Sequence, residues 1–157
     1  MKHIALMLSL FFILGACSTS KNAEIYLPES VRTGIHFGMT LEDFKTLKGD
    51  KVKLENDGMP FRIIYSEAIS NNPIEYVIYY FDADEEKPLY EVILVYKDER
   101  ERDAAAAQLL GVPNFEEKEW RIEREKKETI WAWTFKNKLI VTALIPKTEW
   151  YEDVYGK

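Results

Sequence analysis

The sequence predicts an α+β domain: an antiparallel sheet of about six strands with two helices packed on one face. Three observations predict this class. Aromatic residues make up 13% of the 157 residues, and they concentrate in alternating runs that are typical of half-buried strands. Two segments have helical character and end at a glycine, and polar loops separate the strands. The expected order of elements is α-βββ-α-βββ.

The first helix is expected over residues 40–48. Thr40 can cap it, and Leu41, Phe44 and Leu47 follow at a spacing of three, which places an apolar stripe along one side of a short helix. Gly49 stands where a helix commonly ends.

Three strands are expected next, at residues 61–65, 74–81 and 89–96, with the polar stretch 82–87 as the turn between the last two. Alternation in the middle strand predicts two sets of side chains on opposite faces: Ile74, Tyr76, Ile78 and Tyr80 on one, and Val77, Tyr79 and Phe81 on the other.

The second helix is expected over residues 99–110. Asp98 can cap it, and Gly111 followed by Pro113 stops it. The run of alanines at 104–107 favours a helix and a close approach to the sheet. Three further strands are expected at 119–124, 129–135 and 139–145, with a tight turn at 136–138.

This order divides the domain, which is expected to span residues 31–157, into two similar halves at about 35–96 and 98–146. Each half is a helix followed by three strands, which suggests an internal duplication. The suggestion depends on element order alone, because the two halves share no convincing residue-level repeat.

The N-terminal segment has the composition of an export signal. A short basic start precedes an apolar run at 4–14, and the small residues Gly15 and Ala16 follow. The run is too short to span about 30 Å of hydrocarbon as a stable helix. We therefore expect residues 1–16 to be a signal peptide. Residues 17–30, which are polar and include Pro28, are expected to be a tether.

Leu14-Gly15-Ala16-Cys17 resembles a bacterial lipobox. The resemblance implies cleavage between Ala16 and Cys17, and diacylglycerol and fatty acyl groups such as palmitate on the Cys17 thiol. It implies a lipoprotein anchored in the cell envelope through this lipid. Ser18 after the cysteine favours the periplasmic face of the outer membrane in a Gram-negative cell. In a Gram-positive cell the anchor would lie in the outer leaflet of the cytoplasmic membrane.

The segment 35–44 contains Gly38-Met39-Thr40 followed by Glu42, Asp43 and Phe44. It resembles the motif that opens the small envelope lipoproteins of the BamE (SmpA/OmlA) type, whose modules also recur in β-lactamase-inhibitor-like proteins. The stretch 110–113, Leu-Gly-Val-Pro, followed by Trp120, resembles another part of that pattern. It lies some 60 residues later than the family pattern places it, so the resemblance implies a diverged tandem of the module. From the residues alone, Gly38, Met39 and Thr40 are expected to be structural.

Composition argues against several classes of function. The formal net charge is −6, which disfavours nucleic acid as a partner. A single cysteine permits no disulfide within the chain, and His36, the one histidine beyond the leader, makes a zinc site or a serine–histidine catalytic set improbable. The acidic residues of the 82–87 loop (Asp82, Asp84, Glu85 and Glu86) lack the glycine and glutamate of an EF-hand. We therefore expect no catalytic residues, no metal and no cofactor apart from the covalent lipid.

Aromatic residues offer the strongest indication of a binding surface. The residues concerned are Trp120, Trp131, Trp133, Trp150 and Tyr151. The expected function is that of a non-catalytic, membrane-anchored protein that binds an envelope protein or supports envelope assembly. Two alternatives stay open: an inhibitor or binder of a secreted enzyme, and an enzyme that acts on envelope polymers.

Overall fold

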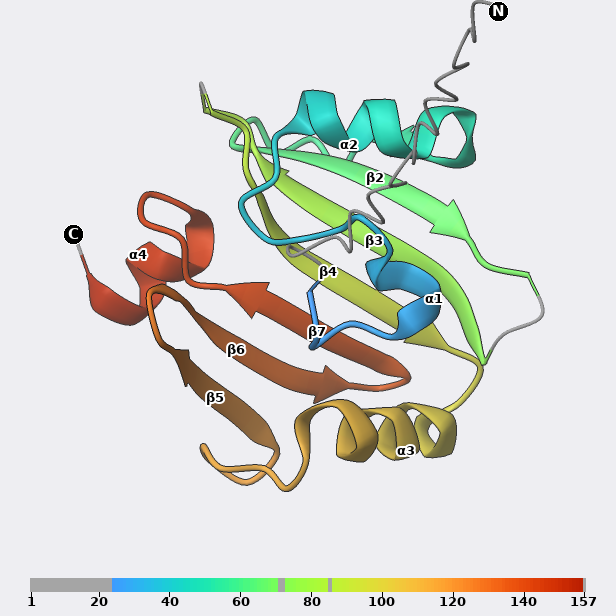
Figure 1. Ribbon diagram of the computed structural model, residues 1–157, viewed down its shortest axis with the longest axis vertical. Coiled ribbons are helices and arrows are strands. Elements are labelled where there is room, and N and C mark those ends of the chain that lie inside the picture. Colours follow the sequence, from blue (N-terminus) through green and yellow to red (C-terminus); the bar gives the residue numbers. More distant parts are fainter. Residues whose placement is uncertain (1–23, 71–72, 85, 157) are drawn as a thin grey trace, which may run out of the picture.

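The computed structural model describes residues 24–70, 73–84 and 86–156, and Figure 1 shows that they form one twisted sheet with helices around it. All neighbouring strands are antiparallel. The strands are β1 (Lys53–Glu55), β2 (Arg62–Ala68), β3 (Ile74–Asp82), β4 (Leu89–Tyr96), β5 (Glu119–Arg124), β6 (Lys127–Phe135) and β7 (Lys138–Ala143). The helices are α1 (Glu29–Arg32), α2 (Leu41–Lys48), α3 (Glu99–Leu110) and α4 (Glu149–Tyr155), with a 3-10 turn at Gly49–Lys51.

The strand order β1-β2-β3-β4-β7-β6-β5 joins two meanders at their last strands. The first meander runs from β1 to β4 and the second from β5 to β7, and β4 pairs with β7 in the middle of the sheet. Each meander is preceded by a helix, α2 for the first and α3 for the second. The two central strands are largely buried, with seven of the eight residues of β4 and five of the six of β7 removed from solvent, and each has a neighbouring strand at both edges.

The main core lies between the sheet and the helices α1, α2 and α3. Phe44 of α2 is fully buried, and its ring centroid lies 5.6 Å from that of Tyr65, 4.8 Å from Tyr79 and 4.9 Å from Phe81. Ala106 places a small buried side chain on α3 where the helix meets the sheet. This packing covers one face of the sheet, which we call the helix face.

A buried ion pair also attaches α2 to the helix face. Lys48 Nζ lies 2.7 Å from Glu67 Oε2 on β2, and the hydroxyl of Tyr79 donates to the same oxygen at 2.8 Å. Both charged side chains are largely removed from water. The hydroxyl and the ammonium together satisfy a carboxylate that would be costly to bury alone.

The predicted count of six strands and two helices is wrong. The described residues form a seven-stranded sheet with four helices, two of them short, so the chain is richer in strand than the predicted class. The additional strand, β1, is a charged three-residue edge strand without apolar alternation. A helix that the sequence did not predict, α4, packs on the other face through Trp150.

Residues 24–30, which the sequence assigns to the tether, lie against the domain. Glu24 is only 4% exposed and its carboxylate lies 2.9 Å from Arg124 Nη1, while Leu27 is fully buried. The backbone N–H of Glu24 also donates to the carbonyl oxygen of Ile35 at 2.9 Å. The packed part of the chain therefore includes Glu24. The predicted signal peptide and Cys17 lie outside the described residues.

Candidate functional site

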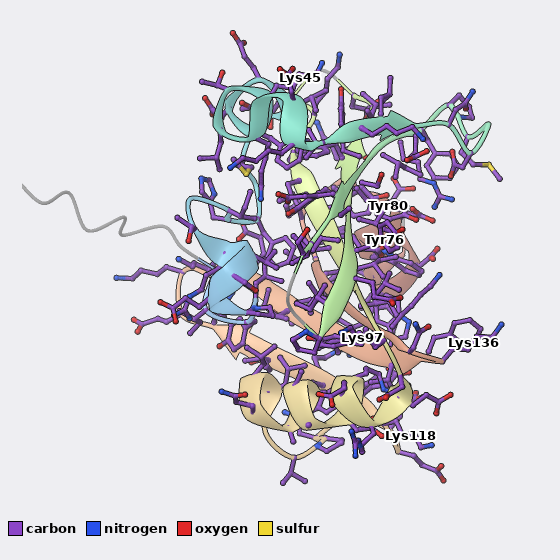
Figure 2. The ribbon with its side chains drawn as sticks, turned by 90° about the vertical axis from the view of Figure 1, so that its right-hand side faces the viewer. Lys45, Tyr76, Tyr80, Lys97, Lys118 and Lys136 are labelled. Atoms are coloured by element: carbon purple, nitrogen blue, oxygen red, sulfur yellow. The ribbon has the colours of Figure 1, made fainter. Side chains whose placement is uncertain are left out.

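The sheet face opposite the helix face is only partly covered. Figure 2 shows Tyr76 and Tyr80 on the side of the sheet away from α1. Residues paired directly across antiparallel strands share a face, so the register identifies the rest of this surface. One row crosses the sheet through Ile78, Ile93, Ile140 and Trp133. We call this surface the open face.

Three tryptophans form a cluster on the open face. Trp131 and Trp133 stand two residues apart on β6, and Trp150 comes from α4. The ring centroids of Trp131 and Trp133 are 4.9 Å apart, and Trp150 meets both rings edge-on at 5.8 Å and 5.1 Å. The indole N–H of Trp131 donates to Glu119 Oε2 at 2.7 Å. The cluster therefore holds α4 on the sheet and leaves the tryptophans half-buried.

Glu91 lies beneath the cluster in the central strand β4. Its side chain accepts a hydrogen bond from the indole N–H of Trp150, and the residue is only 4% exposed. The pKa of Glu91 is raised to about 7, mainly by burial and in part by the carboxylate of Glu149, whereas the Trp150 N–H and the Arg62 guanidinium oppose the rise. Glu91 is therefore a titratable contact between α4 and the sheet, sealed from solvent.

Glu149, the first residue of α4, makes a second polar contact to the sheet. Its carboxylate accepts from the Tyr90 hydroxyl at 2.9 Å and lies 3.3 Å from Arg62 Nη1. Arg62 also pairs with Asp57 at 2.6 Å. Burial raises the pKa of Tyr90, and the Glu149 carboxylate adds to the rise, so the phenol stays a hydrogen-bond donor. The carboxylates of Glu91 and Glu149 are therefore both engaged in contacts between α4 and the sheet.

Arg121 on β5 borders the tryptophan cluster. Its guanidinium carbon lies 4.1 Å from the ring centroid of Phe115 and 5.9 Å from that of Trp131. The Nε atom is buried and has no hydrogen-bond partner among the described residues. The guanidinium therefore packs against two aromatic rings within the range of a cation–π interaction.

The structure brings together three of the five aromatic residues that the sequence singled out. Trp120 instead lies in the core of the helix face, where its indole N–H donates to the carbonyl of Gly111 at 3.1 Å. Tyr151 stacks on Tyr155, with ring centroids 4.8 Å apart, within α4. Trp131, Trp133 and Trp150 form the cluster described above.

Gly38, Met39 and Thr40 lie at the entrance to α2 and contact the hairpin between β3 and β4. Gly38 has a φ of +82° and donates its N–H to Leu89 O at 2.9 Å. Met39 is buried, and Thr40 Oγ1 accepts from the Asp43 N–H at 3.1 Å as the N-cap of α2. A positive φ at Gly38 is accessible because glycine has no Cβ. In the structure these three residues position a helix.

The acidic hairpin loop lines a hollow of about 610 Å³ together with Gly38, Glu128 and Lys147. The Asp84 N–H donates to Asp82 Oδ1 at 2.8 Å, and burial raises the pKa of Asp82. Glu85 lies outside the described residues. His36 makes a 3.1 Å contact from Nδ1 to its neighbour Phe37 O. Over the described ranges 24–70, 73–84 and 86–156, no three His, Cys, Asp or Glu side chains form a group suited to a metal ion.

Sequence reasoning did not single out Glu91, Glu149, Arg62 or Tyr90. One signal for Glu91 was present, because it is the only charged residue in the strand 89–96, and an isolated acid in a buried strand needs a partner. No signal paired Arg62 with Glu149, since 87 residues separate them. Their contact depends on where α4 packs.

None of the helices within the described ranges is long and apolar enough to cross a bilayer. Comparison of the chain with protein-family models, with curated proteins and with solved structures finds no significant match. The resemblance to BamE-type and inhibitor-like modules therefore stays a prediction from short motifs.

Proposed function

We propose that this chain is a lipid-anchored protein of the bacterial envelope that binds another protein through the open face of its sheet. One observation supports the binding role above others. The open face carries a tryptophan cluster next to apolar side chains that no helix among the described residues covers. Aromatic side chains surrounded by polar groups are typical of protein interfaces.

The proposal includes a non-catalytic role. The carboxylates of Glu91 and Glu149 contact Trp150, Tyr90 and Arg62, and these contacts fasten α4 to the sheet. A general acid or base must reach a substrate proton, and Glu91 lies beneath an indole ring. An assembly role and the inhibition of a secreted enzyme would both use such a surface, and the identity of the partner distinguishes them.

The lipobox-like motif at Cys17 supports a proposed location in the cell envelope. In a Gram-negative cell we propose the periplasmic face of the outer membrane, and otherwise the outer leaflet of the cytoplasmic membrane. Two or more acyl chains hold a protein stably at a bilayer, so the domain would stay near the membrane.

The test is co-purification of the full-length protein from gently solubilised membranes. We expect one envelope protein to be recovered in a fixed ratio, and expect Trp133→Ser to reduce its recovery more than Val112→Ser. Val112 is 85% exposed and apolar but lies outside the open face, which makes it the matched control. Recovery of no stoichiometric partner in repeated preparations would contradict the proposed role.

A further inference from the structure

Part of the open face is left uncovered by α4. α4 packs over the row that contains Glu91 and Trp131, whereas the end of the sheet near Tyr76 lies beyond it. A row of paired residues crosses this end through Tyr76, Val95, Lys138 and Phe135. Tyr76 is 51% exposed and Phe135 is 57% exposed. We call these four residues, with Ile78 and Lys136, the uncovered patch.

The uncovered patch carries positive charge on a chain with an acidic balance. Lys138 lies in the row itself, and Lys136 stands in the turn after Phe135, with its Nζ 5.3 Å from the Phe135 ring centroid. Neither lysine forms an ion pair with any described residue. Figure 2 shows Lys136 on the same side of the sheet as Tyr76. Two unpaired ammonium groups beside apolar rings favour an acidic ligand.

The chain enters the domain from the other face. The described residues begin at Glu24, which contacts Arg124 and Ile35, and α1 then lies on the helix face. Figure 1 shows α1 in front of the sheet, while Figure 2 shows Tyr76 on the opposite side. Cys17 and Glu24 are seven positions apart, a reach of at most about 25 Å. If Cys17 carries the anchor, the helix face is turned toward the membrane and the uncovered patch away from it.

From these observations we infer that the uncovered patch docks an acidic segment of an envelope protein, one that also carries apolar side chains. The inference depends on the proposed function, since it names the surface and the partner chemistry for that binding role. Tyr76 and Phe135 would supply the apolar contact, and Lys136 and Lys138 would pair with carboxylates at its rim. Rim charges of this kind steer association and select the partner.

The test is site-specific photo-crosslinking in living cells with the full-length protein. p-Benzoylphenylalanine replaces Phe135 or Tyr76 in turn, and Val112 in the control. We expect both patch positions to give an adduct with one protein, mapped by mass spectrometry to a segment rich in Asp and Glu. The double variant Lys136→Glu/Lys138→Glu should lower the yield about tenfold, and Lys45→Glu/Lys118→Glu should not. Unchanged circular dichroism would show that both double variants fold.

Three results would overturn the inference: adducts with phospholipid alone, equal protein adducts from position 112, and an adduct yield that charge reversal leaves unchanged. No adduct from positions 76 and 135, with a partner whose recovery still falls in Trp133→Ser, would refute the patch and leave the proposed binding role intact. A protein adduct from position 112 alone would contradict the open face as the binding surface as well. Absence of protein adducts from all three positions, together with no partner recovered with the full-length protein, would contradict the binding role as well.

Discussion

At the scale of single residues, two buried tyrosines differ in what their hydroxyls contact. The Tyr79 hydroxyl donates to Glu67 at 2.8 Å, within the ion pair that fastens α2. The Tyr96 hydroxyl is buried with no hydrogen-bond partner among the described residues. Burial raises the pKa of both phenols, so both stay protonated. A buried hydroxyl stabilises the fold only when it is paired.

This difference gives a paired prediction for the free energy of unfolding. Tyr79→Phe should lower it by about 1–3 kcal/mol, because Glu67 loses a buried donor. Tyr96→Phe should leave it unchanged or raise it by up to about 1 kcal/mol, because only an unpaired hydroxyl is removed. Urea unfolding of the two variants measures both changes. An equal loss in the two variants would show that the Tyr96 hydroxyl is paired in solution.

Single residues also show where the alternation rule fails. Strict alternation places Ile74 with Tyr76 and Ile78, yet Ile74 is buried in the core of the helix face. Similarly, Tyr90 reaches Glu149 on the open face although its neighbours Val92 and Leu94 belong to the helix face. Both residues lie at irregularities in the β3–β4 register. A bulge adds one residue to a strand and so shifts the side chains beyond it, which a residue pattern does not predict.

At the scale of elements, α4 determines which part of the open face stays accessible. Trp150 and Glu149 attach it through Glu91, Tyr90 and Arg62. Burial raises the pKa of Glu91 to about 7 in the folded protein, against about 4.3 in an unfolded chain. The folded state therefore binds the Glu91 proton more tightly than the unfolded state does. Stability from this group is full below about pH 4 and is lost as the pH rises through 7.

Glu91→Gln should remove this pH dependence. Between pH 4 and pH 8 the wild type should lose about 3 kcal/mol of unfolding free energy relative to the variant. The amide oxygen of glutamine can still accept from Trp150, so the contact with α4 is retained. Glu75→Gln, at an exposed position of β3, is the control and should follow the wild type. Parallel pH profiles for wild type and Glu91→Gln would disprove the assignment.

Elements with strong periodicity were predictable, and short or charged ones were not. The helix expected at 99–110 is α3, and the strand expected at 89–96 is β4. The edge strand β1 and the four-residue α1 carry no apolar repeat, so local sequence gives them no signal. The sequence analysis names Trp150 as an aromatic binding residue, but the helix that carries it and the face on which it packs depend on contacts with Trp131 and Trp133.

At the scale of the whole molecule, the two sheet faces have different roles. The helix face holds the core and receives the chain at Glu24, whereas the open face carries the tryptophan cluster and the uncovered patch. The sequence identified the tryptophans of the candidate site but not the surface they form, because the strand order brings β3 and β6 into one sheet from segments about 50 residues apart. The proposed anchor at Cys17 would place the helix face toward the membrane and the open face toward the partner.

Metabolic labelling with a palmitate analogue, followed by membrane fractionation, tests the anchor most directly. We expect the wild type and the tether control Ser20→Ala to be labelled and recovered with membranes. Cys17→Ala should be unlabelled and released from the membrane fraction, because no other cysteine is present to carry the acyl groups. An unlabelled wild type, or a Cys17→Ala protein that is labelled as strongly as the wild type, would contradict the account.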